Sequence, residues 1–175
     1  PRVHVIEGEG GMTPGRVSEC LAMASAAGLK NLVLHVDFNQ ASIDSNRVCR
    51  EGDAPGDYVQ WTPDELLYLH DWNVVTVPNG HDFGQVFAAQ ELVSRFSNSQ
   101  PTAIVYTTTK GWRYGIEGKQ SHGAGHGFCS EDFYTALQEF EAGFGVTFPR
   151  FSGERDAVSV ERAYWDHLLV IRRVM

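Results

Sequence analysis

The sequence predicts an α/β fold of three layers, in which a mostly parallel sheet carries helices on both faces. Short apolar segments alternate with segments of helical periodicity in the order strand, helix, strand, helix, strand, helix, strand, which is typical of α/β domains. Residues 31–37 are nearly continuous in apolar character, as expected of a strand that is buried on both faces of a sheet. Because crossovers between parallel strands are right-handed, we expect the connecting helices to cover both faces.

The first predicted strand covers residues 3–7 and leads into a glycine turn. Thr13 and Pro14 are expected to be the N-cap and the first residue of a helix, since proline at that position loses only a donor that has no helical partner. Gly28 is typical of the position just after a helix C-terminus, so we expect the helix to end there. The second strand then covers residues 31–37.

A polar stretch over residues 39–58 follows, and its length suggests a functional role. A short helix begins after Thr62, and a third strand covers residues 73–77. Asp82 and Gln85 resemble a capping box at the start of the next helix. We predict that this helix buries one stripe of apolar side chains, namely Phe83, Val86, Phe87, Val93 and Phe96.

The fourth strand is predicted over residues 102–106, and a glycine-rich loop over residues 110–128 holds two histidines. Two amphipathic helices are expected after this loop. The inward stripe of the second of them is predicted to consist of Val160, Tyr164, Leu168 and Ile171.

Composition limits the classes of function. The chain has 175 residues and a mass of 19.4 kDa, so we expect a single domain over residues 1–175. A formal charge of -8 and a pI near 5.3 argue against nucleic acid as a partner, and no apolar run approaches the roughly 20 residues of a membrane span. Three widely spaced cysteines predict reduced thiols in a cytoplasmic protein. Because the chain opens at Pro1, we expect a fragment of a longer protein.

Polar features follow three of the predicted strands, at the edge of a parallel sheet where ligands bind. They are the glycine turn at residues 8–11, Asn39, and the histidine loop. Backbone N–H groups of a glycine turn that leads into a helix form an anion site. Taken alone, such a turn is equally well explained as a turn without a ligand.

Glu9 and Asn39 would bring oxygen donors to this edge, and oxygen is the ligand that Mg²⁺ prefers. Gly8-Glu9-Gly10, followed thirty residues later by Asn39, is similar to the GDG…N thiamine diphosphate motif of the transketolase family. The similarity covers about residues 3–127. It continues at Gly15 and Glu19, at Asn79-Gly80-His81-Asp82 and at Thr109-Lys110-Gly111. Residues 121–127 resemble the family's H-x-x-H-G segment with one residue inserted.

This resemblance implies that the chain binds thiamine diphosphate together with Mg²⁺ or Ca²⁺. The metal ligands would be Glu9, the side chain of Asn39 and the backbone carbonyl of Ala41. The diphosphate would lie against the glycine turn, with His122 near it or near the reacting centre and His126 as a second catalytic histidine. The implied cofactor-binding residues are Gly8, Gly10, Gly11, Asn39 and His122. A zinc site at the two histidines is disfavoured, because the intervening glycines do not favour the helix that would align them.

The resemblance further implies a transferase that moves a two-carbon ketol unit between sugar phosphates. Activity would need the pyrimidine-binding domain of the same chain or of a second chain, as in a homodimer, so this segment alone is expected to be inactive. A 2-oxo acid dehydrogenase E1 component stays open, because Glu117-Gly118-Lys119 also fits that class, with an oxo acid as substrate. A degenerate domain that serves assembly also stays open, since Glu9 replaces the family's Asp and Pro14 replaces a Glu.

Overall fold

The computed structural model describes residues 1–123 and 125–175, which form two compact units. The first unit comprises Pro1–Trp112 and Glu117–His122, and the second comprises Arg113–Ile116 and Gly123–Met175. Ala124, which belongs to the predicted histidine segment, lies outside the described residues. The expectation of one domain over residues 1–175 stays a prediction.

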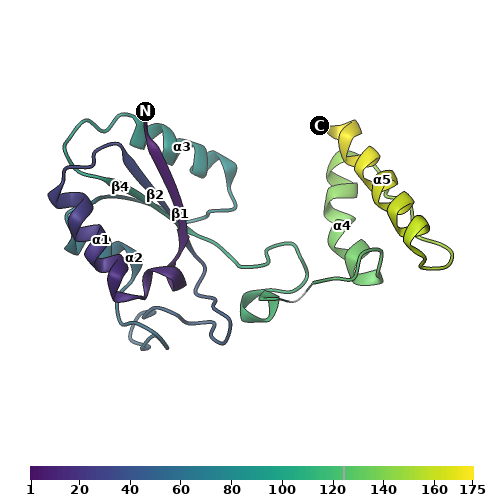
Figure 1. Ribbon diagram of the computed structural model, residues 1–175, viewed down its shortest axis with the longest axis horizontal. Helices are drawn as coiled ribbons and strands as arrows, with labels where there is room; N and C mark the ends of the chain where they lie inside the picture. Colours follow the sequence, from purple (N-terminus) through teal and green to yellow (C-terminus); the bar gives the residue numbers. More distant parts are fainter. Residues whose placement is uncertain (124) are drawn as a thin grey trace. The chain divides into compact units, whose positions relative to one another are not determined.

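The first unit contains a four-stranded sheet in the order β1-β2-β4-β3 (Figure 1). All three neighbouring pairs of strands are parallel, so the predicted α/β fold class is confirmed. Each strand lies within a residue or two of its predicted position. Their bounds are Val3–Gly8 for β1, Leu32–Phe38 for β2, Asn73–Val77 for β3 and Thr102–Thr107 for β4.

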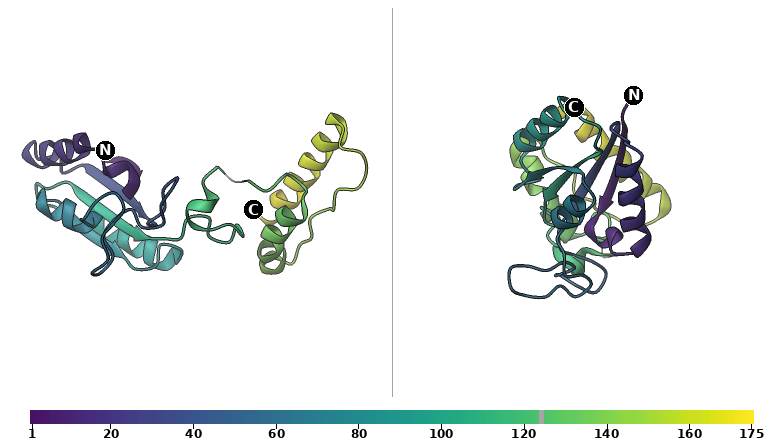
Figure 2. Two further views of the ribbon diagram at one scale, coloured as in Figure 1. Left: turned by 90° about the horizontal axis from the view of Figure 1, so that it is seen from below. Right: turned by 90° about the vertical axis from the view of Figure 1, so that its left-hand side faces the viewer.

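Helices cover both faces of this sheet, as the views in Figures 1 and 2 show. Helices α1 (Gly15–Ala26) and α2 (Pro63–Leu69) pack on one face, and α3 (Phe83–Ser94) packs on the other. Successive side chains of a strand point to opposite faces, so β2 contributes to two separate apolar clusters. The first cluster includes Leu21, Leu34, Val36, Leu67 and Trp72, and the second consists of Val33, Val77, Ala89, Val93 and Ile104.

Helix α3 differs from the prediction in the stripe that it buries. Phe83 and Phe87 were expected to point inward, but their side chains are 86% and 73% exposed. Val93 of the predicted stripe is buried as expected, Val86 and Phe96 pack against the same cluster while partly buried, and Ala89 is buried although the prediction left it out. The predicted cap is confirmed for Asp82, whose carboxylate accepts the backbone N–H groups of Gly84 and Gln85.

Two details at the N-termini of helices α1 and α3 also differ from the prediction. Helix α1 has Pro14 as its N-cap, one residue later than expected, and the hydroxyl of Thr13 donates to the carbonyl of Gly10 instead of capping the helix. The side chain of Gln85 accepts the N–H of Asn79, so the predicted capping box is not closed. Gly28 does follow the C-terminus of α1 with a φ of +62°, as expected of a glycine there.

The second unit contains α4 (Glu131–Phe144) and α5 (Ala157–Val174). The side chain of Ser130 caps α4, and the carboxylate of Asp156 caps α5. On α5 the predicted stripe is partly wrong, because Tyr164 is half exposed whereas His167 is buried. The ring of His167 packs against several aromatic rings, which explains its burial, and these belong to Phe128, Phe133, Tyr134 and Phe148. Among the described residues, no helix has both the length and the apolar character needed to cross a bilayer.

Candidate functional site

Glu9 and Asn39 meet at the carboxyl-terminal edge of the sheet. Glu9 begins a short 3-10 helix (Glu9–Met12) directly after β1, and its side chain is only 1% exposed. Its Oε2 atom accepts the backbone N–H of Asn39 at 3.1 Å. Its Oε1 atom is buried and has no hydrogen-bond partner among the described residues. The structure therefore brings two of the predicted site residues together and leaves one buried carboxylate oxygen unsatisfied.

The surroundings of Glu9 disfavour its negative charge. Burial raises the pKa of Glu9 above its usual value, and the nearby carboxylate of Asp37 acts in the same direction, although the N–H of Asn39 opposes it. Burial, together with the charge of Glu9, also raises the pKa of the Cys49 thiol to about 12. A divalent cation beside Glu9 would reverse this balance, because it would offset the charge that burial penalises.

The side chain of Asn39 is held in a fixed orientation by its neighbours. Its Oδ1 atom accepts the backbone N–H of Ala41 at 2.9 Å, and its Nδ2 donates to Asp37 Oδ2 at 2.9 Å. The other carboxylate oxygen of Asp37 accepts the hydroxyl of Thr108, which follows β4. Asp37 was not among the predicted site residues. Its place near the end of an apolar strand, two residues before Asn39, was the signal for it.

The glycines of the turn differ in their surroundings. A Cβ atom on Gly10 would meet no atom within 4 Å, so the space beside it is open. A Cβ on Gly11 would lie 2.2 Å from a carboxylate oxygen of Glu7, so that space is filled by a side chain of this chain. On Gly8 it would reach the carbonyl of Asp37 at 3.8 Å, an ordinary contact. Of the three, Gly10 is the one beside which this structure leaves room for a ligand.

The segments that resemble family motifs contact one another after β3 and β4. The Nε2 atom of His81 accepts the backbone N–H of Thr109 at 2.8 Å, and its ring stacks on Trp112 with centroids 4.1 Å apart. The ammonium of Lys110 lies 2.9 Å from Nδ1 of His122. Since an ammonium group can only donate, His122 accepts at Nδ1, and its neutral ring carries the proton on Nε2.

The segment before His122 is tied to the polar stretch over residues 39–58. A 3-10 helix covers Gly118–Ser121, and the backbone N–H of Lys119 donates to Oδ1 of Asn46 at 2.6 Å. Because Asn46 belongs to the loop that begins at Asn39, this bond connects the segment carrying His122 to the loop that follows β2. The polar stretch therefore contacts the segment that carries His122, while its functional role stays a prediction.

His126 belongs to the second unit, whereas His122 belongs to the first. Its Nε2 atom lies 2.6 Å from the carbonyl of Tyr114 and its backbone N–H donates to the hydroxyl of the same residue. Within the described ranges, no group of three or more His, Cys, Asp or Glu side chains could hold a metal ion. A metal at the sheet edge would therefore depend on amide and carbonyl oxygens beside Glu9.

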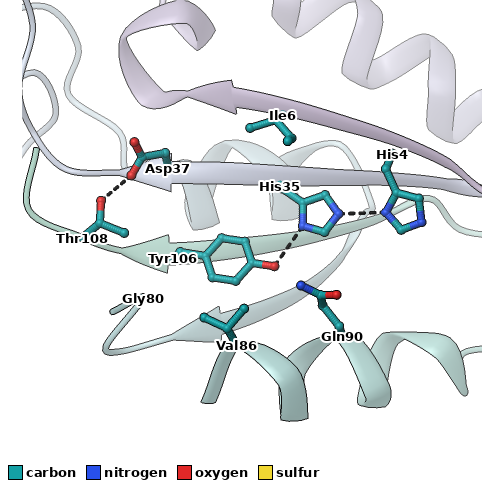
Figure 3. A pocket seen from close by; sticks show the side chains of 9 residues that line it. All are labelled: His4, Ile6, His35, Asp37, Gly80, Val86, Gln90, Tyr106 and Thr108. Atoms are coloured by element: carbon teal, nitrogen blue, oxygen red, sulfur yellow. Dashed lines mark hydrogen bonds between the residues drawn. The ribbon is translucent and has the colours of Figure 1, made fainter. Parts of the chain in front are cut away.

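A pocket of about 460 Å³ extends from this edge along the face of the sheet beside α3 (Figure 3). Asp37 and Thr108 lie at one end of it, and His4, His35 and Tyr106 lie along its floor. Hydrogen bonds of 2.8 Å and 2.9 Å join His4 to His35 and His35 to Tyr106, and the rings stack in the same order. Burial lowers the pKa of His35, and the coulombic effect of His4 acts in the same direction.

Comparisons with known proteins identify relatives for most of the chain. The family model described as transketolase, thiamine diphosphate binding domain, matches residues 2–147. Transketolase of Physarum polycephalum is 23% identical over 177 residues, covering 95% of this chain and 25% of its own length. Human transketolase is 31% identical over 128 residues, covering 72% of this chain and 18% of its own length. Transketolase-like protein 2 of Mus musculus is 33% identical over 110 residues, covering 63% of this chain and 16% of its own length.

Solved structures resemble the chain in fold. Transketolase from Campylobacter jejuni has a TM-score of 0.68 at 21% identity, covering 98% of this chain and 25% of that one. Transketolase from Pichia stipitis, solved as a complex with sedoheptulose 7-phosphate, has a TM-score of 0.67 at 22% identity, covering 98% of this chain and 24% of that one. The chain thus spans about a quarter, or less, of the length of these relatives.

Proposed function

Since the chain belongs to the transketolase family, as a thiamine diphosphate-binding domain, we propose that it binds thiamine diphosphate through a divalent cation at Glu9 and Asn39. The observation that carries this proposal is the orphaned Oε1 atom of Glu9 at the carboxyl edge of a parallel sheet. Mg²⁺ is the cation we propose, with Ca²⁺ as a substitute, because both take oxygen ligands.

The residues present fit a cation and a diphosphate in three respects. A buried carboxylate oxygen of Glu9 lacks a partner among residues 1–123 and 125–175, the space beside Gly10 is open, and the amide oxygen of Asn39 accepts the N–H of Ala41. Glu9 is one methylene longer than the aspartate of the family motif. Its burial and its bond to the N–H of Asn39 show that the longer side chain is accommodated at the edge of the sheet.

The chain's own residues would hold and orient the cofactor. Glu9, the Asn39 amide and the Ala41 carbonyl would bind the cation, and Asp37 would keep the Asn39 amide in place. The turn at Gly10 would donate backbone N–H groups to the diphosphate, whereas the N–H of Gly8 donates to Oε1 of Glu7 in this structure. Nε2 of His122 would also donate to the diphosphate, with the charge of Lys110 alongside. When bound, thiamine diphosphate supplies a ring that accepts electrons during carbanion chemistry.

For the whole protein we propose transfer of a two-carbon ketol unit between sugar phosphates. Relatives named transketolase, one of them solved with a sugar phosphate, support this class over a 2-oxo acid dehydrogenase E1 component. His122 is the candidate catalytic residue of this chain. His126 is a weaker candidate, because its Nε2 already lies at hydrogen-bond distance from the carbonyl of Tyr114.

The proposed activity requires a partner domain. In this proposal, a pyrimidine-binding domain of the same or a second chain completes the site, most simply in a homodimer. The three cysteines, which form no disulfide, support a reducing and therefore cytoplasmic compartment. Neither nucleic acid nor a membrane has a place in this proposal, which agrees with the formal charge of -8.

Calorimetric titration of thiamine diphosphate into the chain, with Mg²⁺ and with EDTA, tests the proposal. We expect binding with Mg²⁺ only, and we expect thiamine without its diphosphate not to bind. Asn39→Ala should weaken the affinity at least 10-fold, the range seen when groups around a metal are removed. Asn31→Ala is the matched control, because Asn31 directly precedes β2, at the end opposite Asn39, and its side-chain amide donates to the carbonyl of Pro1.

Two results would contradict the proposal. Binding that is equally strong in EDTA would remove the cation from it. No binding of thiamine diphosphate at millimolar concentrations, by this chain or by a longer protein that contains it, would favour the degenerate domain that serves assembly.

A further inference from the structure

The second unit contains a pocket of about 330 Å³ between α5 and the segment that precedes it. All of its lining residues fall between Pro149 and His167, beyond the segment matched by the family model, which ends at residue 147. Its volume is at the lower end of the range for small-molecule sites. All of the residues that line the pocket belong to the second unit, whereas Glu9 and Asn39 belong to the first.

Two arginines, Arg150 and Arg162, are among the residues that line this pocket. Arg162, on α5, makes no side-chain hydrogen bond or ion pair with any described residue, although Asp166 lies one helical turn away. Arg150 lies over the ring of Tyr134 at 4.1 Å and is 3.4 Å from a carboxylate oxygen of Glu141. The ring and the carboxylate fix Arg150 in position, while Arg162 keeps all its donors for a ligand. Guanidinium groups bind phosphate strongly, because their donors match its oxygens in pairs.

The remaining lining groups favour a ligand that carries hydroxyl groups as well. The carboxylate of Asp166 has no partner among the described residues, and a carboxylate can only accept hydrogen bonds. It would repel a bare phosphate but accept bonds from hydroxyl groups attached to one. The hydroxyl of Ser152 and the ring of Phe151 complete this side of the pocket and suit a short polyhydroxylated carbon chain.

From this arrangement we propose that the pocket binds a small phosphate monoester with hydroxyl groups on its carbon skeleton. Arg150 and Arg162 bind the phosphate, and Asp166 accepts hydrogen bonds from the hydroxyl groups. The phosphate monoester and inorganic phosphate would both bind to the two guanidinium groups. Asp166 therefore distinguishes a hydroxylated ester from the inorganic ion.

The test is a titration of the ¹⁵N-labelled chain with glycerol 3-phosphate and, separately, with inorganic phosphate, followed by NMR. We expect glycerol 3-phosphate to shift the resonances of residues 149–167 and to bind several-fold more tightly than inorganic phosphate. Arg162→Gln should weaken its binding about 10-fold or more, as expected for charge-assisted hydrogen bonds. The side chain of Arg162 has no partner to lose, so this variant is expected to fold like the parent chain.

Arg172→Gln is the matched control, since it removes the same charge from α5 at a residue that does not line the pocket. It should change the affinity by less than about 2-fold, which is the effect of net charge alone. Asp166→Asn should reduce the preference for glycerol 3-phosphate over inorganic phosphate and strengthen the binding of inorganic phosphate. These two variants separate recognition of hydroxyl groups from general attraction of anions.

The proposal is overturned if both phosphates bind equally, if Arg162→Gln and Arg172→Gln behave alike, or if the shifts occur outside residues 149–167. Resonance shifts confined to residues 8–11 would mean that the phosphates bind at the glycine turn and not in this pocket. Asn39→Ala is expected to leave the titration unchanged, so failure of the cofactor site and failure of this pocket give different results.

Discussion

Glu9 and Asn39, thirty residues apart in the sequence, are joined by a hydrogen bond of 3.1 Å between the Asn39 backbone N–H and Oε2 of Glu9. The bond exists because β1 and β2 are parallel neighbours, so the residues that follow them emerge at the same edge of the sheet. The second oxygen of Glu9 is buried and has no hydrogen-bond partner in the part of the chain that the structure describes. The domain therefore carries a buried charge at the edge where it is proposed to bind a cation.

Replacing Glu9 by Gln is expected to stabilise the chain and to abolish metal-dependent cofactor binding. The change removes a buried charge but leaves a neutral polar atom without a partner, and since a charged unsatisfied group costs more than a neutral one, we expect a gain of about 1 kcal/mol. For a chain of this length, that raises the Tm by roughly 2–4 °C in thermal unfolding without metal. A lower Tm, or unchanged binding with Mg²⁺, would contradict the role given to this carboxylate.

Asp37→Ala is expected to weaken Mg²⁺-dependent binding of thiamine diphosphate by about 10-fold, because the Asn39 amide loses the acceptor that orients it. Thr108→Val removes only a donor to the other oxygen of Asp37 and should have a smaller effect. Calorimetric titration measures both variants. Equal losses in the two would show that Asp37 acts through the segment after β4 and not through Asn39.

Gly10→Ala is expected to change the affinity for thiamine diphosphate without changing the stability of the fold. A Cβ on Gly10 meets no atom within 4 Å, so we expect the Tm to stay within about 2 °C of that of the parent chain. If the diphosphate lies beside Gly10, the added methyl group should weaken binding of thiamine diphosphate at least 10-fold. Gly143→Ala, in α4 and equally open, is the control and should leave binding unchanged. Undiminished binding in Gly10→Ala would place the diphosphate elsewhere.

Gly56→Ala should instead destabilise the fold, by about 1–3 kcal/mol. A Cβ there would lie 2.3 Å from the carbonyl oxygen of Val59 and 2.5 Å from the backbone of Cys49, and backbone atoms cannot rotate away. Urea unfolding measures the loss. Since the loop around Gly56 also holds Cys49 beside Glu9, we expect cofactor affinity to fall with it.

The stability of the chain is expected to decrease as the pH falls through about 6.5, partly because of His35. Burial lowers the pKa of His35 in the folded chain, so the unfolded chain takes up this proton first. The contribution of neutral His35 is fully present above its usual value of 6.5 and is lost below it. Thermal unfolding between pH 8 and pH 5 should show a smaller decrease for His35→Gln than for the parent chain, and parallel curves would exclude this residue as a cause.

Only one of the three cysteines is expected to react rapidly with a thiol reagent at pH 8. Cys20 is exposed, whereas Cys49 and Cys129 are buried and the pKa of Cys49 is raised to about 12. Colorimetric titration should give one fast thiol in the native chain and three after denaturation, with the fast one absent in Cys20→Ser. A fast reaction of Cys49 would mean that the loop over Glu9 opens readily.

Local patterns in the sequence determined the fold class, the edge at which the site residues lie, and several helix ends. Alternating strand and helix segments predicted the parallel α/β sheet, because the apolar runs and helix signals are properties of neighbouring residues. The Gly8-Glu9-Gly10 turn and Asn39 could be placed at one edge for the same reason, since sequential parallel strands end on the same side of a sheet. The N-cap at Asp82 and the glycine after α1 were equally readable from local sequence.

Tertiary structure alone decided which side chains these elements bury and which polar atoms lack partners. Phe83 and Phe87 have the spacing of a buried stripe but remain exposed, because the contact of α3 with the sheet is made by Ala89 and Val93. The bonds of Asp37 to Asn39 and to Thr108, and of Lys119 to Asn46, link residues from different parts of the chain, so no local pattern could reveal them. The unsatisfied oxygen of Glu9 is likewise a property of packing, because only the folded chain excludes water from it.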